Sequence, residues 1–185
     1  MIFSETKIPG VYIIDIERRG DTRGFFARSW CEKELQDRGL TNRVVQENLA
    51  FSHKRGCVRG MHFQLLPHEE VKIVRCTMGA VYDVALDLRA DSPAYMQWVA
   101  SELTAENHRM LYIPEGCAHG YQTLLDNTEI CYQTSEFYAP GAARGVRYND
   151  AAFSIDWPSS VDSISEADRS WPDYVAKRSL ERSRA

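Results

Sequence analysis

Polar side chains that could act on a substrate are concentrated in two segments of a largely apolar stretch of sequence. The first is VRGMHFQ, which contains Arg59 and His62 and is followed after a turn by Lys72. The second is IPEGCAHGYQ, in which His119 lies three residues after Gly116. An imidazole can move a proton near neutral pH or bind a metal, and a nearby cation can stabilise a developing negative charge. These segments therefore predict either proton-transfer chemistry or a metal site.

The elements that must position these segments are short strands. Runs rich in Val, Ile, Tyr, Phe and Thr alternate with turns containing Gly, Pro, Asn and Asp from Val11 to about Trp157. This pattern is typical of an all-β sandwich or barrel. The expected strands are 11–17, 25–30, 44–52, 58–64, 71–77, 80–88, 98–103, 109–114, 120–125 and 129–137.

Helix signals are few. SWCEKELQDRGL predicts one short helix with Ser29 as N-cap and Gly39 as its stop, and short helical turns broken at Pro172 are expected from Ser163. The length of 185 residues is enough for one substantial core, so we expect a single domain over 1–185, with a frayed tail at about 175–185.

Alternation within the strands predicts how they face. In AVYDVALDL the even-numbered residues from Tyr82 to Leu88 are apolar, whereas Asp83 and Asp87 have the other parity, which predicts one buried face and one face that is polar or lines a cavity. Lys72, in an apolar strand, is expected at an edge, extended outward, or in a wet pocket.

Arg59 and His62 have opposite parity, so a regular strand would point them to opposite faces. A bulge at Gly60 would bring both side chains inward.

A metal site is the first hypothesis for the histidines, because the PxGxxH spacing before His119 resembles the second motif of the cupin superfamily. Cupins that bind iron or manganese also need His-x-His and a carboxylate in their first motif. This chain has Met61-His62-Phe63 there, with no carboxylate at the expected place. We therefore expect no metal, with a metal-dependent cupin oxygenase as the alternative.

Charge and composition limit the partners. The net charge of -4 argues against nucleic acid, which requires a broad excess of Lys and Arg, whereas one small anion needs only a few local cations. The sequence contains no run of eighteen apolar residues, and MIFSETKIPG lacks the pattern of a secretion signal, so we expect no membrane association and a cytoplasmic protein. The five scattered cysteines indicate reduced, structural thiols.

The order and spacing of several segments together resemble the dTDP-4-dehydrorhamnose 3,5-epimerase family. The similarity extends from about Ile8 to the 165–168 region, and its segments are GDTRGFFARSW, VVQENLAFSHKRGCVRGMHFQ, VKIVRCTMGAVYDVALDLR, DSPAYMQW, LYIPEGCAHGYQ, EICYQTSEFYAP, VRYND and FSIDWP. The resemblance implies a cupin-type jelly-roll β-barrel with short flanking helices, no cofactor, and a homodimer in which Arg23 serves the partner's site. The implied substrate is a nucleotide-diphosphate 4-keto sugar, and the implied reaction converts dTDP-4-dehydro-6-deoxyglucose to dTDP-4-dehydrorhamnose.

The resemblance also implies roles in catalysis. The ketone acidifies the hydrogens on C3 and C5, so a base on one face and an acid on the other can invert each carbon through an enolate. His62 matches the family's base, Asp168 the aspartate paired with it, Tyr132 the acid, and Lys72 the cation near the enolate oxygen. Without the resemblance, these residues also fit ordinary roles in a core, at a helix start or between strands.

Binding residues follow from the same resemblance. Arg23 and Arg59 match cations that contact the diphosphate, and Tyr138 matches the aromatic residue that stacks on the nucleobase. The further substrate contacts are Gln46, Asn48 and His119.

Two positions depart from the family pattern. Arg28 stands where a glutamate is common, and Ala143 where another acidic residue is common, which leaves the nucleotide and the sugar open. Cys117 replaces a usual phenylalanine and indicates a packing change. The alternatives are an epimerase acting only at C3 or only at C5, a more distant sugar 3,4-ketoisomerase, the cupin oxygenase and a non-catalytic sugar-nucleotide binding module.

Overall fold

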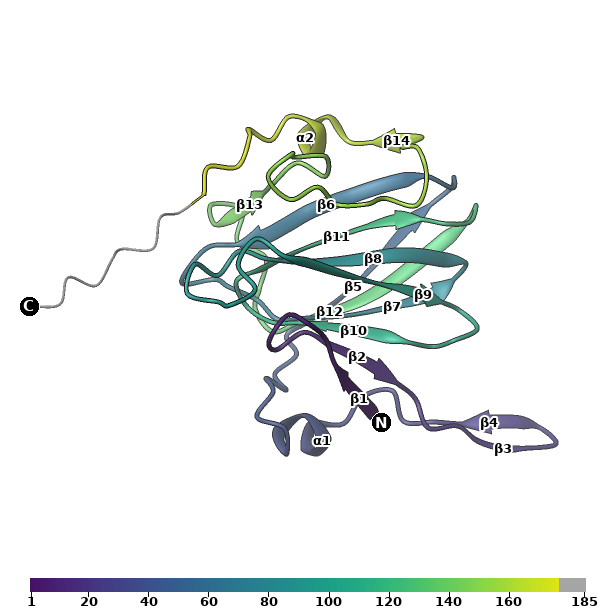
Figure 1. The fold of residues 1–185 in the computed structure, drawn as a ribbon. Helices are drawn as coiled ribbons and strands as arrows, with labels where there is room; N and C mark the ends of the chain where they lie inside the picture. The colour runs from purple at the N-terminus through teal and green to yellow at the C-terminus, as the bar shows by residue number, and fades with distance from the viewer. Residues whose placement is uncertain (177–185) are drawn as a thin grey trace, which may run out of the picture.

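The structure is a computed structural model that describes residues 1–176. Strands dominate these residues and confirm the all-β prediction (Figure 1). The expected frayed tail lies outside the described residues from 177 onward, and the single domain over 1–185 stays a prediction.

Two antiparallel sheets face each other around the core (Figure 1). The first sheet has the order β1-β2-β10-β7-β12-β5 and the second β13-β6-β11-β8-β9, with β14 parallel to β6. The first sheet comprises β1 (Ile2–Glu5), β2 (Tyr12–Asp15), β10 (Met110–Ile113), β7 (Lys72–Met78), β12 (Thr128–Thr134) and β5 (Gln46–Ser52). The second comprises β13 (Ala143–Gly145), β6 (Cys57–Gln64), β11 (Cys117–Thr123), β8 (Ala80–Asp87), β9 (Trp98–Thr104) and β14 (Ser163–Ile164).

Nine of these strands, β2 and β5 to β12, overlap ranges expected from the sequence, and so does β4, which covers only Gly24–Phe26 of the longer expected run. The strand β4 pairs with β3 (Arg19–Asp21) in a separate hairpin that extends away from the two sheets (Figure 1). The strands that alternation did not reveal, namely β1, β3, β13 and β14, have four residues or fewer.

The main core lies between the sheets and takes side chains such as Val74, Ala85 and Ile130 from both. A second cluster covers the outer face of the second sheet, where Val84 and Leu86 pack with residues of the 146–157 segment. Both faces of β8 are therefore buried, and the prediction of a single buried face was wrong.

The two short helices flank the sheets. The helix α1 (Glu32–Gln36) has Cys31 at its N-cap position with no side-chain cap, so the prediction of Ser29 as N-cap was wrong. Gly39 adopts φ +67° and the N–H of Leu40 donates to the carbonyl of Leu35, which confirms the predicted stop.

The helix α2 (Glu166–Arg169) is capped by Ser165, whose hydroxyl accepts from the N–H of Asp168. Within residues 1–176, neither helix has the length and apolar character that crossing a bilayer requires.

Candidate active site

A cavity of about 530 Å³ opens between the two sheets. Strands β5, β7 and β12 form one wall, β6 and β13 form the other, and α2 borders it. Seven of the residues singled out in the sequence line this cavity: Gln46, Asn48, His62, Lys72, Tyr132, Tyr138 and Asp168. The predicted base and acid thus share one pocket, although they come from different sheets.

His62 and Asp168 form a pair at the edge of this cavity. The Nε2 atom of His62 lies 2.6 Å from Oδ1 of Asp168, and the N–H of Gly60 donates to Oδ2 at 3.3 Å. Burial acts to raise the pKa of Asp168, but the hydrogen bond and charge of His62 outweigh it and hold this pKa below its ordinary value. An ionised Asp168 keeps a proton on Nε2, so Nδ1 is the nitrogen that can accept one.

The strand β6 contains the bulge that was predicted at Gly60. His62 pairs with His119 and Arg59 with Tyr121, so two residues of β6 oppose the single Gly120 of β11. The bulge puts Arg59 and His62 on the same face. Gly60 has φ +128°, and a Cβ there would lie 2.5 Å from the Cα of Gly120, so the bulge requires a glycine.

Lys72 and Tyr132 occupy the wall opposite His62. Lys72 is buried, points into the cavity and forms an ion pair with Glu70. Burial lowers the pKa of Lys72, whereas the adjacent Glu70 raises it. Burial and the charge of Glu70 raise the pKa of Tyr132, while Arg59 acts in the opposite direction. The phenol therefore keeps its proton at neutral pH and can donate it.

The mouth of the cavity carries an exposed aromatic side chain. Tyr138 is 65 % exposed, and its N–H donates to Oε1 of Gln46 at 2.8 Å. Gln64 holds the same loop, because its side chain bonds Phe137 and Ala139. The arrangement leaves the ring free to stack on a flat ligand group.

Comparison with known proteins identifies the family. The family model for dTDP-4-dehydrorhamnose 3,5-epimerase matches residues 5–175. The chain belongs to the dTDP-4-dehydrorhamnose 3,5-epimerase family. The Shigella flexneri protein of that name is 41% identical over 172 residues, covering 92% of this chain and 94% of the relative. A dTDP-4-dehydrorhamnose 3-epimerase from Streptomyces niveus is 38% identical, covering 88% of this chain and 78% of that protein.

Solved structures of the family have the same fold. The Bacillus anthracis enzyme with TDP and PPi bound superposes with a TM-score of 0.90 at 38% identity, covering 94% of this chain and 99% of that one. The Legionella pneumophila enzyme in complex with dTDP-4-keto-L-rhamnose gives 0.83 at 36% identity, covering 90% and 89%. The predicted cupin-type jelly-roll β-barrel is confirmed, and the chain is an isomerase of this epimerase family.

Three of the family-matched residues do not line the cavity in this chain. Arg23 is exposed at the tip of the β3–β4 hairpin and bonds Asp21. His119 points into the barrel, where its Nε2 lies 2.8 Å from Oδ1 of the fully buried Asp83. Arg59 donates to the carbonyl of Phe51 at 3.0 Å, close to the cavity but outside its lining.

The structure adds cavity residues that the sequence did not reveal. Glu70 lies two residues before Lys72, so an extended segment points both side chains to the same face. This spacing could have identified Glu70 as a cavity residue. Arg144 and Trp171 line the cavity only because β13 and the segment after α2 fold onto β6, and no local pattern encodes that contact. The remaining additions are Phe63, Gln64, Thr134 and Ala167.

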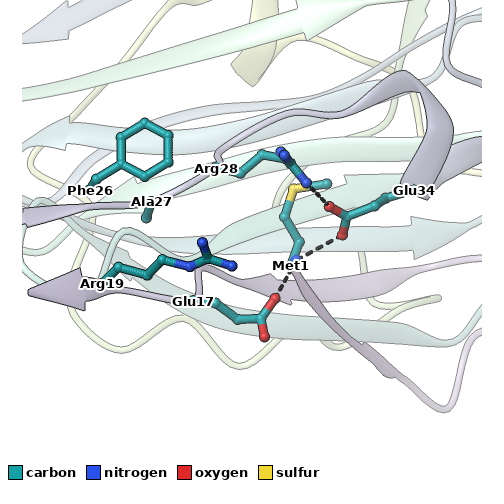
Figure 2. A pocket seen from close by; sticks show the side chains of 7 residues that line it. All are labelled: Met1, Glu17, Arg19, Phe26, Ala27, Arg28 and Glu34. Carbon is teal, nitrogen blue, oxygen red and sulfur yellow. Dashed lines mark hydrogen bonds and ion pairs between the residues drawn. The ribbon is translucent and has the colours of Figure 1, made fainter.

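The departures from the family pattern lie in different places. Ala143 lines the cavity, and Cys117 is buried in the main core, as its packing role predicts. Arg28 borders a separate hollow of about 90 Å³, where its guanidinium donates to Glu34 at 2.8 Å (Figure 2). The amino group of Met1 binds the same Glu34 and also Glu17, each at 2.7 Å (Figure 2). Arg28 and the N-terminus are therefore linked through the carboxylate of Glu34.

No three His, Cys, Asp or Glu side chains of residues 1–176 are grouped as a metal ion would require. The partner of His62 is Asp168 and that of His119 is Asp83, so each described pair has one imidazole and one carboxylate. The alternative of a metal-dependent oxygenase finds no ligand set among these residues.

Proposed function

We propose that this protein epimerises C3 and C5 of dTDP-4-dehydro-6-deoxyglucose to give dTDP-4-dehydrorhamnose, without a cofactor. The observation that carries the proposal is the arrangement of the cavity. The His62–Asp168 pair and the Tyr132 phenol lie on opposite walls, with Lys72 on the same wall as the phenol. The relatives' names and the sugar nucleotide bound to the Legionella pneumophila enzyme agree with this substrate.

In the proposed reaction Nδ1 of His62 removes the proton from C3 or C5. The electron pair of the C–H bond forms a double bond to C4, and the π pair of the C4 carbonyl moves to its oxygen to give an enolate. The Lys72 ammonium stabilises that oxygen. Tyr132 then delivers its proton to the same carbon from the opposite face, and the C=O bond re-forms. Before the next inversion, the His62 imidazolium releases its extra proton to solvent and the Tyr132 phenolate takes one up.

A homodimer is part of the proposal, because Arg23, which the family resemblance matches to the diphosphate, does not line the cavity of its own chain. Lys72 is already paired with Glu70, whereas the Arg23 side chain is 87% exposed on a hairpin that projects from the body of the chain (Figure 1). A hairpin of this kind can reach a second copy and supply Arg23 to its cavity. Location in the cytoplasm and the lack of a nucleic-acid partner stay predictions.

The deciding experiment incubates the purified protein with dTDP-4-dehydro-6-deoxyglucose in deuterated water and locates deuterium by NMR. We expect deuterium at both C3 and C5, with L-configured product. Label at one carbon alone would support a mono-epimerase such as the Streptomyces niveus 3-epimerase. Binding without exchange would indicate a non-catalytic module, and activity lost with chelator and restored by iron or manganese would indicate the oxygenase class.

A further inference from the structure

Glu70 is a carboxylate inside the cavity that the reaction itself does not use. It lies just before β7, and Lys72 is the first residue of that strand. Their side chains form an ion pair in which Lys72 is 9% and Glu70 12% exposed. Two charges are thus largely removed from water on the wall that carries Tyr132.

A buried ion pair of this kind costs desolvation that a hydrophobic pair would avoid, so stability alone does not explain it. Its effect on the lysine is specific. Burial lowers the pKa of Lys72 below its ordinary value, and the charge and hydrogen bond of Glu70 limit that shift. The same carboxylate helps to raise the pKa of Tyr132. Glu70 therefore favours the protonated state of both groups on this wall.

We propose that Glu70 is a positioning residue for the epimerase reaction, which holds the Lys72 side chain as an ammonium against the cavity wall, where the C4 oxygen gains charge. This role rests on the proposed function. Without the carboxylate, burial would leave more of Lys72 as a neutral amine, which stabilises an enolate less than an ammonium does. With it, more of Lys72 is in the ammonium form before substrate binds.

The other titratable groups near this pair come from several elements. Ile113 of β10 and Thr134 of β12, which flank Lys72 in the sheet, carry no charge. The titratable side chains around the cavity are His62 and Arg59 from β6, Tyr132 from β12, Tyr138 from the loop after β12, Arg144 from β13 and Asp168 from α2.

The first test measures the pKa of the Lys72 amine in the absence of substrate. The pKa of its amine is followed by NMR of ¹³C-methylated protein, with Lys72→Arg to assign the signal. We expect this pKa to be lower in Glu70→Gln than in wild type, and to return toward wild type in Glu70→Asp. Glu102→Gln, which removes an exposed carboxylate from β9, is the matched control and should leave it unchanged. An unchanged pKa in Glu70→Gln would overturn the proposal.

The second test is the pH profile of kcat/KM for the same variants, with thermal melting to verify that each is folded. The alkaline limb of Glu70→Gln should move to lower pH, because Lys72 then loses its proton at lower pH. A uniform loss of activity at every pH would indicate a purely structural role and contradict the proposal. If wild type shows no deuterium exchange, the proposed function fails, while the Lys72 titration still decides whether Glu70 holds the ammonium.

Discussion

In the proposed reaction, the carboxylate of Asp168 determines which nitrogen of His62 is available as the base. It lies 2.6 Å from Nε2 and accepts from the N–H of Gly60, while the backbone N–H of Asp168 donates to the hydroxyl of Ser165. Because Asp168 is largely buried and ionised, it both orients the ring and stabilises the imidazolium that forms on proton abstraction.

Removing either member of this pair should therefore abolish most activity. We expect His62→Ala to reduce kcat by about 10²- to 10⁴-fold, the range for loss of a general base, with the fold retained because His62 is half exposed. Asp168→Asn should also lower kcat, because the amide no longer favours the required tautomer. Steady-state kinetics and circular dichroism check both results. Wild-type turnover in His62→Ala would contradict the assignment of the base.

Tyr132 acts at a different step, so its loss should have a different signature. Tyr132→Phe removes the phenolic proton donor but leaves His62 and Lys72 in place. We expect solvent deuterium to enter the recovered substrate while inversion slows, and NMR of the mixture measures both. If Tyr132→Phe inverts at the wild-type rate with the same product, the phenol only packs between strands.

At the level of elements, the bulge in β6 is the feature that aligns Arg59 with His62. It depends on Gly60, where a side chain would meet the backbone of β11 at Gly120 and His119. Gly60 also donates its N–H to Asp168. One residue thus sets the register of β6 against β11 and supports the catalytic pair.

Gly60→Ala should lower the free energy of unfolding by more than the strain of alanine at this positive φ, because its Cβ also clashes with β11. Gly24 provides a matched control, because its φ of +130° is close to the +128° of Gly60 and a Cβ there meets nothing within 4 Å. Strain at such a φ costs about 1–3 kcal/mol, which both alanine variants share, and only Gly60→Ala adds the clash. Denaturant unfolding of the two variants measures the difference, and equal losses would show that the clash relaxes freely.

The sequence predicted the elements better than it predicted their surroundings. Runs rich in β-forming residues located ten of the strands, and the parity conflict between Arg59 and His62 identified the bulge. The sequence pattern missed short strands such as β13, whose pairing with β6 depends on contacts distant in sequence. It also missed the burial of both faces of β8, because the 146–157 segment that covers one face carries no periodic signal. Family resemblance, rather than pattern, supplied the catalytic roles.

At the level of the whole molecule, the cavity and the hairpin lie on different parts of the chain. The β3–β4 hairpin extends beside β2, whereas α2 and its Asp168 lie against β6 on the far side of the two sheets (Figure 1). The edge strand β5 exposes apolar side chains such as Leu49 and Phe51.

A mixing experiment tests whether Arg23 serves a second copy. Arg23→Ala and His62→Ala should each be weakly active alone, but subunit exchange should restore activity. Random exchange makes half of the dimers mixed, and each mixed dimer has one site with both residues intact, so about one quarter of wild-type activity is expected. Light scattering establishes the dimer first. A monomer, or no recovery on mixing, would contradict the shared site.

The two halves of the catalytic pair are 106 residues apart, and Asp168 follows every strand of both sheets in the chain. During synthesis, therefore, the strands leave the ribosome before the carboxylate that completes the base. A nascent chain can close its barrel and still be unable to turn over substrate. In the proposed mechanism, enzymatic competence is consequently acquired late, when the segment that carries Asp168 docks on β6.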